Sequence, residues 1–127
     1  MDGRRRDVLL LLGLVALAVA LRAASWAAAP AIFNDGPAFL GIARAMAAGE
    51  WGRALEHDYH PLYSFATLVV QLLRGAPDVS ASWERSAVAV SIAAGAASVV
   101  LLYALLRRIF DRGVAAAGAL VLAVHPT

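Results

Sequence analysis

Cysteine and lysine are both missing from this 127-residue sequence, and charged residues of any kind are few. Without cysteine the chain can form no disulfide framework, use no thiolate nucleophile and build no cysteine-ligated metal site. Only 16% of the residues are charged, whereas about a quarter are charged in a typical soluble domain. The length suits one small domain rather than two.

Hydrophobic residues make up 61% of the chain, and they gather in blocks at 8–29, 87–106 and 114–124. Blocks of this kind indicate contact with lipid rather than the core of a water-soluble protein. We therefore predict an all-α membrane protein with a transmembrane helix at about 8–29 and a large outer loop at about 30–84. Two further transmembrane helices are expected at about 86–106 and 110–126.

All 11 basic residues are arginines, and six of them flank the apolar blocks: Arg4, Arg5, Arg6, Arg107, Arg108 and Arg112. The positive-inside rule explains these six without a nucleic-acid partner, so we expect none. Because three arginines precede the first block, the N-terminus is predicted to be cytoplasmic. The expected location is a cell membrane, specifically a bacterial inner membrane, with several crossings.

The first block is long enough to cross a bilayer, at about 33 Å for 22 helical residues. Its one charge is Arg22, whose long side chain could reach the outer headgroups and bind an anionic lipid phosphate. A cleavable signal peptide ending near Ala27, Ala28 and Ala29 is the alternative. The topology of the later segments is the same either way.

An amphipathic helix is predicted within 31–48, because Phe39, Ile42, Ala43 and Met46 recur at helical spacing. Asn34 or Asp35 can cap its start, Pro37 suits its first turn, and Gly49 can end it. A second apolar stretch, 61–73, is too short to span a bilayer. We interpret it as a helix lying in or near the outer interface.

Two groups in the outer loop could carry chemistry. Asp35 follows the first block closely, so it could act as a general base on a membrane-bound substrate, or it could simply cap the helix after it. His57 and His60 would share a face of a helix and could bind a metal, although no third ligand has matching spacing. The alternative is that His60-Pro61 forms the turn that starts the interfacial helix.

An ordered series of short segments resembles the N-terminal part of the glycosyltransferase family 39 relatives, which include protein O-mannosyltransferases and the lipid A aminoarabinose transferase. The segments are Leu21-Arg22, Phe33-Asn34-Asp35-Gly36-Pro37, Leu40-Gly41-Ile42-Ala43-Arg44-Ala45-Met46, Gly49-Glu50-Trp51, His60-Pro61-Leu62-Tyr63, Leu106-Arg107-Arg108-Ile109-Phe110 and His125-Pro126. The resemblance covers essentially the whole chain and implies the membrane-embedded GT-C fold.

The resemblance also implies an activity, namely transfer of a sugar from a polyprenyl-phosphate donor to a glycan, lipid or protein acceptor on the outer face. It implies that Asp35 acts as a base or positions the acceptor, and we predict the role of base. We also expect Arg22 at the carrier phosphate and His60 at the substrate. Many relatives carry a second acid where this chain has Gly36. This departure argues against a paired-carboxylate or metal-assisted mechanism. We therefore expect no cofactor, and a divalent metal is the alternative.

Members of that superfamily are several times longer, so we expect the chain to be an N-terminal part that is inactive alone. The alternative is a small non-enzymatic membrane protein or subunit that acts through helix packing, for which Ser91 and Gly95 offer a small-residue pair. A transporter fragment would want polar residues near the bilayer midplane, and 87–106 offers only Ser91, Ser98 and Tyr103.

Overall fold

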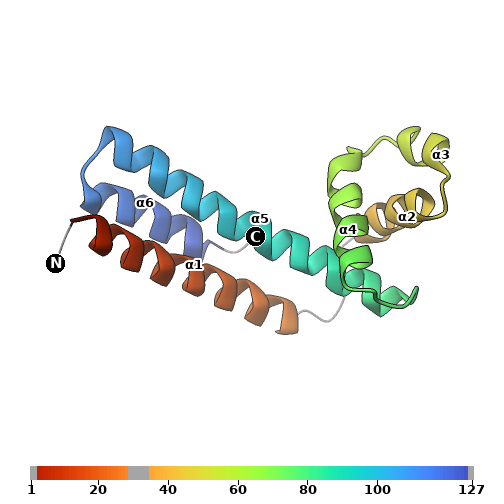
Figure 1. The fold of residues 1–127 in the computed structure, drawn as a ribbon, viewed down its shortest axis with the longest axis horizontal. Helices are drawn as coiled ribbons and strands as arrows, with labels where there is room; N and C mark the ends of the chain where they lie inside the picture. The colour runs from red at the N-terminus through yellow and green to blue at the C-terminus, as the bar shows by residue number, and fades with distance from the viewer. Residues whose placement is uncertain (1–2, 29–34, 126–127) are drawn as a thin grey trace. The chain divides into compact units, whose positions relative to one another are not determined.

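The computed structural model describes residues 3–28 and 35–125, and within them every regular element is an α-helix (Figure 1). The all-α class is thus confirmed for this part of the chain. The elements are α1 (Gly3–Ala28), α2 (Gly36–Ala47), α3 (Trp51–Leu55), α4 (Pro61–Leu73), α5 (Ser80–Ile109) and α6 (Arg112–Val124).

The chain divides into two compact units. The three-helix unit comprises residues 1–28 and 92–127, and the loop unit comprises residues 29–91. Helix α5 contributes its first part to the loop unit and its remainder to the three-helix unit.

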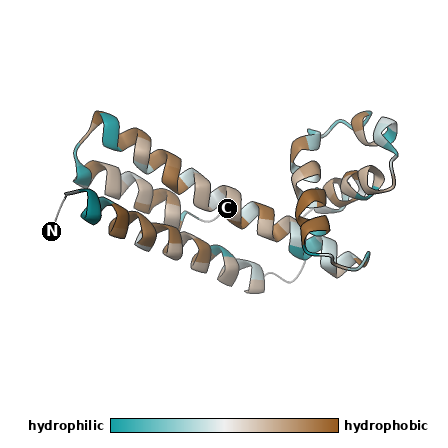
Figure 2. Cartoon of the chain, in the orientation of Figure 1, coloured by the Kyte–Doolittle hydropathy of each residue, from teal (hydrophilic) through white to brown (hydrophobic). Residues whose placement is uncertain are grey.

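Among the described residues, helices α1 and α5 are long and apolar enough to cross a membrane. Their 26 and 30 residues correspond to about 39 and 45 Å of helix, against about 30 Å for a hydrocarbon core. Figure 2 shows the hydrophilic colour at the start of α1 and at the turn from α5 to α6, with long apolar stretches between. These are the ends that the arginines of the sequence flank.

Helix α6 is shorter than the third crossing that the sequence predicted at 110–126. It has 13 residues, or about 20 Å of helix, and residues 126–127 lie outside the described part. It begins after Asp111, whose Oδ1 accepts a hydrogen bond from the Val114 amide at 3.0 Å. Such a side-chain cap fixes the start of a helix at this residue.

The three-helix unit packs through small side chains. Ala115, Ala119 and Ala123 of α6 are fully buried, together with Ala18 of α1 and Val99 of α5. Alanines at every fourth position form a smooth stripe along one face, which lets helix backbones approach closely. In this unit α1 and α6 run in the same direction. Arg112 in the first turn of α6 donates to the Gly3 carbonyl in the first turn of α1, and Arg22 near the end of α1 donates to the Ala123 carbonyl near the end of α6.

The loop unit has its core along α2, which buries Leu40, Ile42, Ala43 and Met46 against Leu68, Trp83 and Ala54 of the other helices. The start and end of α2 are those that Pro37 and Gly49 predicted. Pro37 lies in its first turn, and Gly49 follows its C-cap with a positive φ of 81°. The Gly49 and Glu50 amides donate to the carbonyls of Met46 and Ala45, which closes the helix end.

Helix α4 has the bounds of the apolar stretch at 61–73. His60 is extended and Pro61 occupies the first turn, as expected for proline at a helix start. Gly75 ends it with a positive φ of 55°. The five-residue α3 was not predicted from the sequence. Neither was the early start of α5 at Ser80, six residues before the predicted 86.

Candidate functional site

Asp35 stands at the N-cap position of α2, but its carboxylate does not cap the helix. Its backbone is α-helical (φ −91°, ψ −15°), whereas a capping residue is normally extended, and its side chain accepts no hydrogen bond from the described helix amides. Instead the Tyr59 hydroxyl donates to Asp35 Oδ1 at 3.0 Å. The alternative cap, Asn34, lies outside the described residues.

Aromatic rings from three segments form a cluster that Tyr59 connects to this acid. Phe39 of α2 contacts Tyr59 of the α3–α4 connection, with ring centroids 5.0 Å apart, and meets Tyr63 of α4 edge-on at 5.2 Å. The Tyr63 hydroxyl donates to the Ala87 carbonyl at 3.0 Å and lies 3.0 Å from the Ser91 hydroxyl, both in α5. Ser91 is therefore engaged by α4.

Tyr59 is the residue that links the acid to the rings. Its phenol ring stacks on His57 at a centroid distance of 5.2 Å while its hydroxyl reaches Asp35. The hydrogen bond to Asp35 and the negative charge of that carboxylate raise the pKa of Tyr59 above its usual value of 10.0. The phenol therefore keeps its proton at neutral pH and remains a hydrogen-bond donor.

The two histidines of the loop are not arranged as a helical ligand pair. Residues 56–60 have no helical structure, and His60 is the extended N-cap of α4. Within residues 3–28 and 35–125, no three histidine, aspartate or glutamate side chains gather as a metal site. His60 instead borders an apolar groove of about 410 Å³ lined by Met46, Trp51, Leu55, Pro61, Leu62 and Phe65.

Arg22 belongs to the three-helix unit, and its guanidinium is hydrogen-bonded to backbone carbonyls. Its guanidinium donates to the carbonyls of Ala18, Leu122 and Ala123 at 3.3–3.4 Å. The last two are carbonyls at the end of α6, which have no partner in their own helix and carry the negative end of its dipole. Arg22 and Asp35 thus belong to different units, and we treat them as separate features.

A charged cluster that the sequence did not reveal joins the three helices at the arginine-rich end. Asp7 of α1 accepts hydrogen bonds from Tyr103 at 2.7 Å and from Arg112 Nε at 2.6 Å, and Arg107 Nε lies 3.5 Å away. Arg112 also donates to the Gly3 carbonyl at 2.8 Å. The only sequence signal was a single acid placed between a run of arginines and an apolar block.

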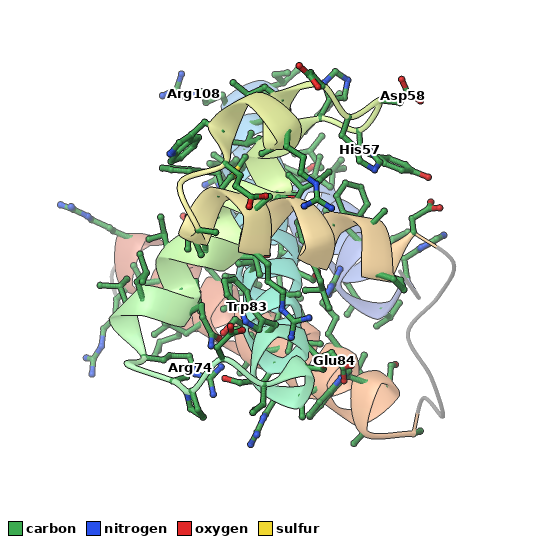
Figure 3. The ribbon with its side chains drawn as sticks, turned by 90° about the vertical axis from the view of Figure 1, so that its right-hand side faces the viewer. His57, Asp58, Arg74, Trp83, Glu84 and Arg108 are labelled. Atoms are coloured by element: carbon green, nitrogen blue, oxygen red, sulfur yellow. The ribbon has the colours of Figure 1, made fainter. Side chains whose placement is uncertain are left out.

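A second unforeseen cluster lies inside the loop unit, around the Gln71 side chain. Its amide donates to the carbonyls of Ala76 and Pro77 and to Ser82, and its oxygen accepts from Ser82 and Ser86. Arg74, which Figure 3 labels, donates to the Ser86 hydroxyl at 2.8 Å. This network fixes the turn between α4 and α5.

The start of α5 is held to α2 by Trp83, which is also labelled in Figure 3. Trp83 is buried, its indole N–H donates to Asp78 at 2.6 Å, and Arg44 of α2 lies over its ring at 5.9 Å. Arg44 forms an ion pair with Asp78 at 3.6 Å and donates to the Ser80 hydroxyl. It therefore helps to hold α2 against the start of α5.

Comparison with known proteins returned no relative. No protein-family model, no curated protein and no solved structure matches the chain.

Proposed function

We propose that this chain is part of a membrane enzyme that transfers a sugar from a polyprenyl-phosphate donor to an acceptor on the outer face of a cell membrane. The observation that carries the proposal is the hydrogen bonding of the Asp35 carboxylate. An aspartate at an N-cap ordinarily bonds to its own helix, whereas this carboxylate is exposed and held by the Tyr59 hydroxyl.

In the proposed reaction Asp35 takes the proton from the acceptor hydroxyl as that oxygen attacks the anomeric carbon of the sugar. The bond from that carbon to the phosphate oxygen breaks, and polyprenyl phosphate leaves with the electron pair. A base must lie within hydrogen-bond reach of the attacking hydroxyl. Because Oδ1 accepts from Tyr59, the hydroxyl orients the carboxylate, and we assign the proton transfer to Oδ2.

The aromatic residues beside Asp35 support a sugar as the substrate. Phe39, Tyr59 and Tyr63 supply rigid ring faces and hydroxyl groups within one small region of the loop unit. Rings of this kind combine a large apolar contact with a polar tip. A pyranose has the matching character, with apolar C–H faces and hydroxyl edges.

The membrane setting is the second part of the proposal. Helices α1 and α5 would cross the bilayer, with the arginine-rich ends on the cytoplasmic side and the loop unit outside. A site that follows the first crossing directly would lie near the headgroups, where a lipid-linked donor presents its sugar.

The test is donor consumption by membranes of cells that produce the protein from its complete reading frame. We expect Asp35→Asn to lower turnover by about 10²–10⁴-fold, the usual contribution of a general base. Asp58→Asn is the matched control, because Asp58 is an exposed aspartate of the same unit whose carboxylate points away from the ribbon in Figure 3.

The alternative of a non-enzymatic membrane subunit makes a different prediction for the same variants. If Asp35→Asn retains wild-type turnover, or if no variant-sensitive release of polyprenyl phosphate is seen, the base assignment is wrong. Tyr59→Phe refines the result, because it keeps the ring but removes the hydroxyl that orients Asp35. We expect it to lower turnover by about tenfold, the equivalent of one hydrogen bond.

A further inference from the structure

Helix α4 buries polar side chains and exposes apolar ones, the reverse of a surface helix in a water-soluble protein. Its buried residues are Ser64, Thr67, Leu68 and Gln71, so three of the four are polar. Ser64 donates to the Phe39 carbonyl and Thr67 to the Tyr63 carbonyl, both at 2.9 Å. The polar groups that α4 turns inward are thus satisfied within the protein.

The outward face of α4 is apolar. Leu62 is 77% exposed, Leu72 68% and Leu73 82%, and Phe65 is half exposed between them. Trp51 and Leu55 of α3 continue this surface across the groove that Met46 and His60 also line. Figure 2 shows the apolar colour on α4, and no charged residue occurs between His60 and Arg74. We call Trp51, Leu55, Leu62, Phe65, Leu72 and Leu73 the α3–α4 face.

Water would favour the opposite arrangement. A surface helix in water buries its apolar stripe and exposes its polar side. Exposed leucines alone are ordinary, but buried polar residues combined with exposed leucines on one helix are informative. In lipid, by contrast, polar groups must find partners inside the protein and apolar side chains face the hydrocarbon.

We infer that the α3–α4 face is covered by lipid acyl chains, with α4 lying in the outer leaflet rather than above it. Only residues 29–35 separate α1 from α2, a reach of at most about 25 Å, so the loop unit is tethered close to a membrane that α1 crosses. Arg53, which pairs with Glu50, lies between Trp51 and Leu55 in sequence, and Arg74 directly follows Leu73. Both arginines are exposed, as expected for basic residues near anionic headgroups. Trp51 has the amphipathic ring usual at that level.

The inference rests on α1 and α5 crossing a membrane, and not on sugar transfer at Asp35. It is tested with nitroxide labels on single cysteines, which need no background removal because the chain has no cysteine. Labels at Leu62→Cys and Leu72→Cys probe the face. Leu101→Cys, on an exposed position of α5, reports the proposed crossing, and Asp58→Cys reports an exposed position of the α3–α4 connection whose side chain points away from the ribbon in Figure 3.

The full chain is placed as single copies in nanodiscs of phosphatidylcholine and phosphatidylglycerol, and collisions with oxygen and with a water-soluble nickel chelate are measured. We expect labels at 62 and 72 to resemble that at 101, with frequent oxygen and rare nickel collisions, while the label at 58 collides frequently with nickel. A second measurement uses Trp51 fluorescence in a Trp26→Phe, Trp83→Phe background. We expect lipids with brominated acyl chains to quench this fluorescence.

Three outcomes would overturn the inference. Nickel-accessible labels at 62 and 72 beside a lipid-exposed label at 101 would place the face in water while leaving the crossings intact. A nickel-accessible label at 101 would remove the membrane premise itself. Labels shielded from both reagents, with spin–spin broadening at higher protein loading, would show that a second copy covers the face.

Discussion

Arg22 of α1 occupies the space that a side chain at Gly95 of α5 would fill. A Cβ built on Gly95 would collide with Arg22 Nε and lie 2.9 Å from Cζ. The same guanidinium holds the last carbonyls of α6, at Leu122 and Ala123. One glycine in α5 therefore permits an arginine in α1 to fasten the end of α6.

We predict that Gly95→Ala destabilises the three-helix unit by ~1–3 kcal/mol, because the added methyl group must displace Arg22 from its carbonyl partners. Unfolding in mixed micelles, followed by circular dichroism, measures the change. Gly13→Ala is the matched control, since a Cβ at Gly13 meets nothing within 4 Å. Alanine is the better helix former, so the control should be neutral or stabilising.

A double-mutant cycle separates this explanation from general crowding. If Gly95 matters because it makes room for Arg22, Gly95→Ala should cost much less in an Arg22→Leu background. Equal costs in both backgrounds would show that the methyl group disturbs something other than the arginine.

Periodicity and end signals predicted much of the helical framework. Pro61 and Gly75 determine α4 by rules that act within a few residues, and Pro37 and Gly49 do the same for α2. Helix α3 escaped prediction because five residues are too few to show a period.

The contacts that position the candidate site escaped prediction for another reason. Tyr59 and Asp35 are 24 residues apart in sequence, and Asp7 and Tyr103 are 96 apart. No local pattern identifies such partners. Arg22 was expected at headgroups or a carrier phosphate, but two of its three carbonyl partners become available only where α6 ends beside it. A role for Arg22 at the phosphate stays a prediction.

Ser86→Ala should destabilise the loop unit by ~1–3 kcal/mol. The Ser86 hydroxyl is fully buried, donates to Gln71 Oε1 at 2.7 Å and accepts from Arg74, so its loss leaves polar partners short of a hydrogen bond. Ser98→Ala is the control in the same helix, because Ser98 is exposed and its hydroxyl donates within its own helix, to the Ala94 carbonyl. Similar midpoints of thermal unfolding for the two variants would contradict a structural role for the network.

Asp7→Asn should loosen the arginine-rich end of the three-helix unit. The substitution removes the negative charge that Arg112 and Arg107 face, and it weakens the acceptor for Tyr103. We expect faster amide exchange in the first turn of α6, measured by hydrogen–deuterium exchange in micelles. Arg108→Ala, at an exposed position with no ion pair among the described residues, should leave that exchange unchanged. Unaltered exchange in Asp7→Asn would show that helix packing alone holds α6.

Titration of Tyr59 tests the link between the acid and the rings. Its pKa is raised above about 10, the ordinary value, mainly by the hydrogen bond to Asp35. Asp35→Asn should therefore lower the pKa of Tyr59, measured as phenolate absorbance of each protein minus that of its Tyr59→Phe counterpart. Asp58→Asn should lower it less, because Asp58 acts only through its charge.

The sign of the effect on stability follows from the same shift. Folding favours protonated Tyr59, so its contribution is fully present below the unfolded pKa near 10 and is lost as the pH rises through the higher folded pKa. The loop unit should thus lose stability above pH ~10 in the wild type, and less so in Tyr59→Phe. A pKa of Tyr59 that is identical in wild type and Asp35→Asn would mean that the hydroxyl does not bind the carboxylate in solution. The orientation argument for Asp35 as a base would then fail with it.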